Sequence, residues 1–333
     1  MTGGRRHGLL LGGLAALVGA LFTASLLTGP APIGAREELA ALLRPQGDLL
    51  AIVMHELRLP RAILGALVGA SLGLAGAALQ GFLRNPLAEP GLVGTSASAA
   101  LGAVLAIQTG LAATMPLATL VAALAGALVS VLLILMLAGL NQGSLPLILA
   151  GIALSALAGA ATSLVLNLSP NPFAANEIIF WMMGSLADRS MLHVATTLPF
   201  FLAGAALLLW TGRGLRALTL GEDAAASMGI PLGRLRLAVV AGTAALVGSA
   251  TAVAGAIGFV GLVVPHLLRR AVGADPARLM PASALGGAAV VLAADVAVRL
   301  IAPDRDLKLG VLTALVGAPF FLHLIYRTRR EGL

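Results

Sequence analysis

Residues 58–98 constrain the fold of this chain more than any other stretch. A run of about twenty residues without a charge follows Arg61, the length of a helix that spans a bilayer core. The run ends in a polar segment with breaks at Asn85-Pro86 and Glu89-Pro90, and the sequence then becomes apolar again. We therefore expect a membrane helix followed by a proline-stiffened loop of the kind that lines a gate.

The apolar run also carries small residues at every fourth position. They are Gly65, Gly69, Gly73, Ala77 and Gly81, which fall on one face of a helix. Small residues on one face let the backbone of a second helix approach closely. This stripe predicts a tight helix–helix contact along most of the span.

Composition extends this interpretation to the whole chain. Of 333 residues, 59% are hydrophobic and 11% are charged, which is far outside the range of soluble domains. We expect one all-α polytopic membrane domain covering residues 1–333. The net charge of +7 does not indicate nucleic acid binding, because basic residues are spread over the loops. The chain has no cysteine, which excludes disulfides and thiolate chemistry.

Hydropathy predicts about ten spans. The first could be read as a signal peptide, but it is too long for a signal-peptide core and further spans follow. Arginine and lysine concentrate in alternate loops, which places both termini in the cytoplasm. The predicted spans are 8–29, 61–82, 91–108, 115–138, 145–167, 191–210, 235–256, 258–271, 281–302 and 308–326, the eighth short and broken at Pro265.

Two segments resemble each other at an offset of 179 residues. The sequence ALVGASLGLAGA at 66–77 matches ALVGSATAVAGA at 245–256, and Pro86 then aligns with Pro265. Because the copies begin five spans apart, they would run in opposite directions. An inverted repeat of this kind is common in transporters.

No energy source is visible in the sequence. The single lysine, Lys308, is not part of a phosphate-binding GK[ST] motif, so the chain is not expected to hydrolyse ATP. An ion-driven carrier would need an ionisable residue within a span, and Asp295 is the candidate. Because Arg299 lies one turn further along, we favour a local Asp295–Arg299 ion pair over a proton site.

Three other features each allow a functional and a structural interpretation. The five histidines show no metal-ligand spacing, and His266 is the best of a weak set of candidate ligands. The segment 169–190 predicts a short half-helix directed into a pathway, or simply aromatic residues at a membrane interface. The polar segment 213–236 predicts one or two short helices, with a capping box at Thr219 and Glu222 and a stop at Gly229 and Pro231. It could dock a cytoplasmic partner or be an ordinary surface helix.

Taken together, the motifs resemble the FecCD family of bacterial ABC importer permeases over almost the whole chain. The most specific pieces are RLPR at 58–61, RNPLAEPGLVGTS at 84–96, FWMMGSL at 180–186, GAIGFVGLVVPHLLR at 255–269, AAD at 293–295 and LGVLTALVGAPFFL at 309–322.

This resemblance implies a type II importer permease of the bacterial cytoplasmic (inner) membrane, working as a homodimer surrounded by membrane lipid. It implies two cytoplasmic ATPase subunits and a periplasmic or lipid-anchored substrate-binding protein. No cofactor or metal is expected on the permease itself, because ATP and Mg²⁺ would bind to the partner ATPase.

The resemblance also assigns roles to residues. Asn85 and Leu87 would form the cytoplasmic gate, with a second constriction at Ser144 and Leu147. Arg58, Arg61 and Arg299 would dock carboxylates of the binding protein, as guanidinium groups do well. The ATPase coupling residues would be Leu218, Thr219, Leu220, Gly221, Glu222, Asp223, Ala224, Ala225, Ala226, Ser227 and Met228.

We therefore predict a permease subunit for a metal chelate, with a ferric siderophore preferred over haem or cobalamin. The alternative from another class is an ion-coupled secondary transporter that uses Asp295.

Overall fold

The fold is taken from a computed structural model that describes residues 2–29, 34–43, 48–115, 117–139, 144–302 and 307–330. Its first half contains α1 (Thr2–Leu27), α2 (Ala35–Ala41), α3 (Leu49–Ile52), the π-helix η1 (Val53–Arg58), α4 (Leu59–Phe82), the 3₁₀ turn η2 (Pro90–Val93), α5 (Thr95–Gln108), α6 (Leu111–Thr114), α7 (Ala118–Ala138) and α8 (Ser144–Asn167). Its second half contains α9 (Pro172–Met182), α10 (Met191–Trp210), α11 (Gly212–Leu218), α12 (Glu222–Ser227), α13 (Leu232–Ala254), α14 (Val260–Arg269), α15 (Pro276–Ile301) and α16 (Leu309–Arg330).

The helices confirm the predicted all-α membrane fold. Within the described ranges, seven helical stretches are long and apolar enough to cross a bilayer, and three shorter apolar helices accompany them. Each of the ten predicted spans overlaps one of these ten stretches. The chain is therefore a multi-pass membrane protein.

One predicted boundary is wrong in an informative way. The span expected to start at Arg61 is continuous with helical residues from Leu49 onward. Proline normally ends a helix because it lacks an N–H group, yet Pro60 is accommodated at the start of α4. The preceding π-helix makes this possible, because the Leu59 N–H donates to the carbonyl of Met54, five residues back.

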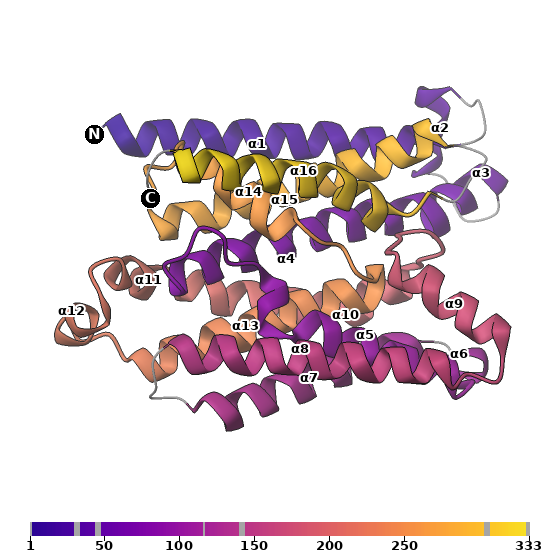
Figure 1. The fold of residues 1–333 in the computed structure, drawn as a ribbon. Coiled ribbons are helices and arrows are strands. Elements are labelled where there is room, and N and C mark those ends of the chain that lie inside the picture. Colours follow the sequence, from indigo (N-terminus) through magenta and orange to yellow (C-terminus); the bar gives the residue numbers. More distant parts are fainter. Residues whose placement is uncertain are drawn as a thin grey trace.

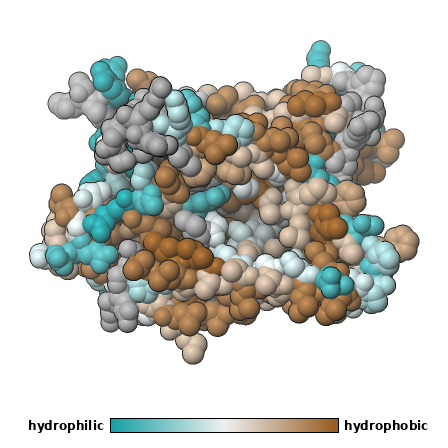
Figure 2. All heavy atoms as spheres, in the orientation of Figure 1, coloured by the Kyte–Doolittle hydropathy of each residue, from teal (hydrophilic) through white to brown (hydrophobic). Residues whose placement is uncertain are grey.

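The helices place the connecting segments at two ends of the molecule (Figure 1). At one end, α1 begins, α16 ends, and α11 and α12 lie together; we call this the α11 end. At the other, α2, α3, α6 and α9 lie together, and we call this the α9 end. In Figure 2, apolar side chains cover much of the visible face between these ends, and hydrophilic side chains gather toward them.

The predicted small-residue stripe is the contact between α4 and α15. A Cβ at Gly69 would collide with the Gly287 carbonyl, and one at Gly73 with the Ser283 carbonyl. The two backbones therefore touch without intervening side chains, which confirms the tight contact that the spacing predicted.

The two copies of the predicted repeat lie on α4 and α13. These helices pack together and run in opposite directions, as an inverted repeat requires (Figure 1). The copies diverge before the match ends, because α4 continues to Phe82 whereas α13 ends at Ala254, two residues before the end of the second copy. The aligned prolines consequently differ in structure: Pro86 lies in a loop and Pro265 within α14.

Candidate functional site

The predicted coupling segment forms two short helices at the α11 end. Leu218, the last residue of α11, and Ala225 in α12 are buried in the main core and anchor the segment. Leu220 and Met228 flank α12 with side chains that are 68% and 62% exposed. The segment thus presents two exposed apolar side chains at a polar end of the molecule.

The start of α12 differs from the prediction, whereas its end agrees. The predicted capping box is wrong, because the Thr219 hydroxyl donates to the Arg216 carbonyl at 2.7 Å instead of capping α12. The helix begins two residues later, with Gly221 as its N-cap. The predicted stop is confirmed: Gly229 has φ +80°, and the Ile230 N–H donates to the Ala225 carbonyl at 3.1 Å.

An ion pair joins this segment to α15. Two nitrogens of Arg216 donate to the two carboxylate oxygens of Asp275 at 3.2 and 2.7 Å. The same carboxylate caps α15 by accepting the Ala277 N–H at 3.0 Å. A displacement of α11 therefore acts directly on the first turn of α15.

The predicted gate residues Asn85 and Leu87 lie in the segment between α4 and α5. We call residues 83–94 the re-entrant segment. The Asn85 side chain is exposed and accepts the Leu87 N–H at 2.9 Å, an Asx turn that shapes the loop. The Asn85 N–H in turn donates to the Gln80 carbonyl of α4 at 3.2 Å, so the turn is tied to the helix end.

The second predicted gate position lies elsewhere. Ser144 begins α8, and its side chain lies outside the described residues. Leu147 is buried in the main core. The contact of α8 with the re-entrant segment comes later, where the Ser155 hydroxyl donates to the Gly91 carbonyl at 3.4 Å. Sequence spacing gave no signal for this contact, because it depends on how α8 crosses the segment.

The three predicted docking arginines lie close together at the α9 end, and each makes an ion pair within the chain. Arg58 is buried and pairs with Glu38 at 2.7 Å, while donating to the Leu26 carbonyl at 2.8 Å. Arg61 and Arg299 both bind the buried Asp295, at 2.8 and 2.6 Å. We call these five residues the α9-end ion cluster.

The predicted Asp295–Arg299 pair is confirmed, whereas the partnerships of Arg61 and Arg58 were missed. Arg61 and Asp295 are 234 positions apart in sequence, so helix periodicity could not reveal their contact. A carboxylate in a long apolar run did signal that some cation must pair with it.

A polar cavity of about 550 Å³ lies beside α9. Helix α9 is the short helix predicted in the segment 169–190, and the Asn171 side chain caps its N-terminus. The Lys308 ammonium lies 5.5 Å from the centre of the Phe180 ring, within cation–π range. Burial lowers the pKa of the nearby Arg189 guanidinium, and the charge of Asp188 opposes that shift. The other lining residues are Glu177, Trp181, Ser185 and Ala187.

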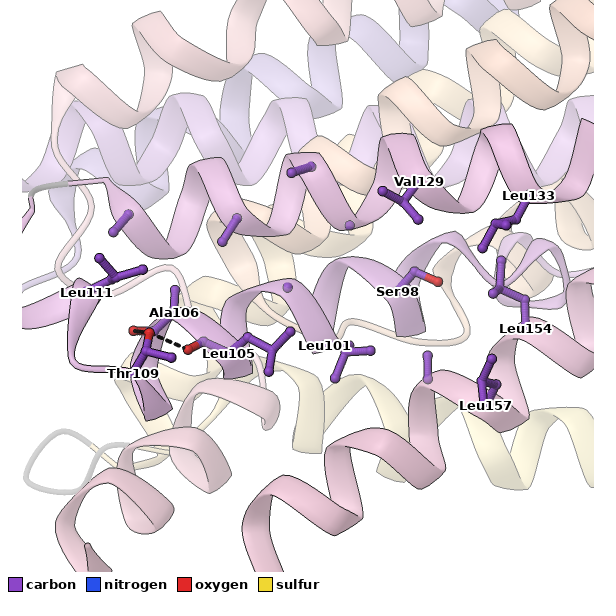
Figure 3. Close-up of a pocket in the computed structure, with 16 residues that line it drawn as sticks. Ser98, Leu101, Leu105, Ala106, Thr109, Leu111, Val129, Leu133, Leu154 and Leu157 are labelled. Atoms are coloured by element: carbon purple, nitrogen blue, oxygen red, sulfur yellow. Dashed lines mark hydrogen bonds between the residues drawn. The ribbon is translucent and has the colours of Figure 1, made fainter. Parts of the chain in front are cut away.

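A second cavity, of about 510 Å³, lies between α5, α7 and α8 and is almost entirely apolar (Figure 3). Leucine side chains from the three helices surround it, including Leu101, Leu133 and Leu157. The Thr109 hydroxyl in its wall already donates to the Leu105 carbonyl at 2.7 Å. Such a wall suits a hydrocarbon chain rather than a polar cargo.

Comparison with known proteins agrees with these features. Residues 17–327 match the model of the FecCD transport family. The chain is 42% identical to the cobalamin import system permease BtuC of Halobacterium salinarum, over 82% of this chain and 73% of the relative. It is 39% identical to the hemin transport system permease HmuU of Yersinia pestis, over 85% and 86%. A solved inward-facing ABC transporter of the metal-chelate type superposes with a TM-score of 0.85 at 32% identity, covering 96% of this chain and 99% of that one.

Proposed function

The chain belongs to the FecCD transport family of ABC importer permeases, and from this premise we propose that it carries a ferric siderophore. It is the membrane subunit of an importer for a metal chelate, haem or cobalamin, and a separate ATPase hydrolyses ATP. The observation that carries this function is the match over residues 17–327.

The polar cavity beside α9 supports a siderophore. It is lined by two carboxylates, Glu177 and Asp188, and by two cations, Arg189 and Lys308. Such a lining suits an oxygen-rich, charged chelate better than the flat apolar face of haem. Haem and cobalamin, which the named relatives carry, are the alternatives.

The importer partners fit the two ends of the molecule. An ABC importer permease works with ATPase subunits and a substrate-binding protein. We propose two copies of this chain, with two ATPases at a cytoplasmic α11 end and the binding protein at the α9 end. Exposed Leu220 and Met228 support ATPase contact, and Arg216–Asp275 would pass the motion to α15.

Docking at the α9 end is supported by the charge of the α9-end ion cluster itself. This cluster holds three guanidinium groups and two carboxylates, and Arg61 is the most exposed of the three arginines, at 22%. A carboxylate of the binding protein could pair with Arg61 while Arg299 keeps Asp295 occupied. We expect Arg61→Glu to weaken docking in a binding assay at low salt, with ATPase assembly intact, and unchanged affinity would refute the role.

An ion-coupled carrier is the competing function. It would need Asp295 to exchange ions, yet both Arg61 and Arg299 bind this carboxylate. Reconstitution in liposomes with and without the ATPase separates the two classes. We expect uptake of a ferric siderophore to require ATP and the ATPase, whereas uptake driven by an ion gradient alone would overturn the proposal. Haem and cobalamin offered to the same liposomes test the cargo.

A further inference from the structure

Glu89, a residue with no assigned role, lies well inside the span region. Its neighbour Pro90 packs against Gly261, and Gly261 also lies against the Leu72 carbonyl of α4. Leu72 is ten residues before the end of α4 at Phe82, which is about 15 Å along a helix. The re-entrant segment thus carries Glu89 to a depth where a charged residue is retained only for a reason.

The Glu89 carboxylate binds the start of α14. Its Oε1 accepts the Phe259 N–H at 3.0 Å. Phe259 is the N-cap of α14 and has φ +67°, which is an unfavourable backbone conformation for a phenylalanine. The N-terminus of this ten-residue helix carries partial positive charge, so an anionic acceptor stabilises it. Glu89 therefore caps α14 across 170 positions of sequence.

The start of α14 is held by close packing on its other sides. A Cβ at Gly76 of α4 would collide with the Gly261 carbonyl, and one at Gly317 of α16 would collide with Phe259. Pro90 of the re-entrant segment also packs against Gly261, but the Glu89 side chain borders a cavity of about 180 Å³ that is also lined by Ser96 and Gly258. The cavity leaves the Glu89 carboxylate room to move away from the Phe259 N–H.

We propose that Glu89 is a positioning residue of the transport cycle, whose charged carboxylate reversibly ties the re-entrant segment to the unwound start of α14. The inference rests on the proposed importer function, because Asn85 and Leu87 lie on the same segment. While the cap is made, these gate residues move together with α14. Its release lets the segment move separately.

The absence of cysteine from the chain makes the proposal directly measurable. Gly91 lies in the re-entrant segment, is exposed, and has open space where a side chain would extend. A Gly91→Cys reporter therefore requires no background substitutions. The complex with ATPase and binding protein is reconstituted in liposomes, and maleimide labelling is timed without nucleotide and with ATP trapped by vanadate.

We expect Glu89→Ala to accelerate labelling in the nucleotide-free state by about two- to fivefold, the population change that loss of one helix-terminal charge produces. The labelling contrast between the two nucleotide states should shrink, and more ATP should be hydrolysed per cargo imported. Glu89→Gln keeps an acceptor without the charge, so its effect should have the same direction and a smaller size. Exposed Glu56, at the α9 end, provides the matched control Glu56→Ala, for which no change is expected.

Two results would overturn the proposal. The first is that Glu89→Gln leaves both the labelling contrast and the number of ATP molecules hydrolysed per cargo at the wild-type values. This result would overturn the proposal even if the Glu89→Ala complex does not assemble. The second is that Glu89→Ala lowers the yield of assembled complex but leaves the number of ATP molecules hydrolysed per cargo unchanged. That is the behaviour expected if the cap only stabilises the fold. Failure of the importer assignment would differ from both, because the wild-type complex would then show no ATP-dependent uptake.

Discussion

The two ends of α15 carry the same kind of ion pair in opposite surroundings. At the α11 end, Arg216 binds Asp275 with the arginine side chain 56% exposed. At the α9 end, Arg61 and Arg299 bind Asp295, whose side chain is 1% exposed. An exposed pair contributes little to stability, whereas removal of one member of a buried pair strands a charge in an apolar environment.

The difference extends to what each pair connects. The α9-end ion cluster joins α2 through Glu38, α4 through Arg61 and α15 through Asp295. It also reaches α1, because Arg299 donates to the Ser25 carbonyl and Arg58 to the Leu26 carbonyl. The Arg216–Asp275 pair joins α11 to α15 alone. We interpret the α9 end of α15 as a fixed attachment. At the α11 end, water can replace either member of the Arg216–Asp275 pair, so we interpret that end as a flexible joint.

The largest effect is expected from Asp295→Ala. The substitution leaves Arg61 and Arg299 without their shared carboxylate, and we expect a loss of about 3–5 kcal/mol in unfolding free energy. Thermal unfolding of the purified protein in detergent measures it. Asp275→Asn, which keeps the α15 cap and removes the exposed charge, is the control. Equal losses for the two variants would contradict the contrast between the ends.

A smaller effect is expected where α4 and α15 touch between the ends. Gly73→Ala places a methyl group against the Ser283 carbonyl, and overpacking of this kind costs about 1–3 kcal/mol. Gly12→Ala in α1 is the control, since that position has open space around it. If both variants unfold at the same temperature, the helices are not in backbone contact.

Arg216→Ala should change stability by less than about 1 kcal/mol, because its pair is exposed and screened by salt. Its effect should appear in coupling, as more ATP hydrolysed per cargo in reconstituted liposomes. Arg216→Lys retains the charge but loses the two-pronged contact, and we expect an intermediate ratio. Wild-type ratios for both variants would show that the joint does not transmit motion.

The smallest effect on stability is expected for Leu220→Ser, within about 0.5 kcal/mol, since the side chain is exposed. The same change should lower the affinity for the ATPase, as measured by co-purification over a range of ATPase concentrations. Leu168→Ser, which changes an equally exposed leucine between α8 and α9, is the control, and we expect it to leave the affinity unchanged. Unaltered affinity would remove Leu220 from the proposed contact.

Local pattern predicted what depends on neighbouring residues. The positions of the apolar helices, the glycine stripe and the Asp295–Arg299 pair all follow from local sequence pattern, and all are confirmed. The π-helix before Pro60 was missed because proline usually marks a helix start, and the capping box at Thr219 was wrong because helix α12 starts later.

Contacts between distant segments could not be predicted. Nothing local in the sequence around Glu89 shows that the loop re-enters and that its carboxylate reaches the Phe259 N–H. Arg58 similarly finds Glu38 only through the packing of α2 against the neighbouring helices. The gate, coupling and docking roles of individual residues stay predictions, because they concern motion and partners.

The backbone contact between α4 and α15 has a mechanical consequence. With no side chains between them at Gly69 and Gly73, neither helix can roll or slide without its carbonyls striking the other. The ion pair between Arg61 of α4 and Asp295 of α15 joins the two helices a second time. We therefore expect α4 and α15 to tilt as one rigid unit about their attachment at the α9 end, rather than to slide past each other.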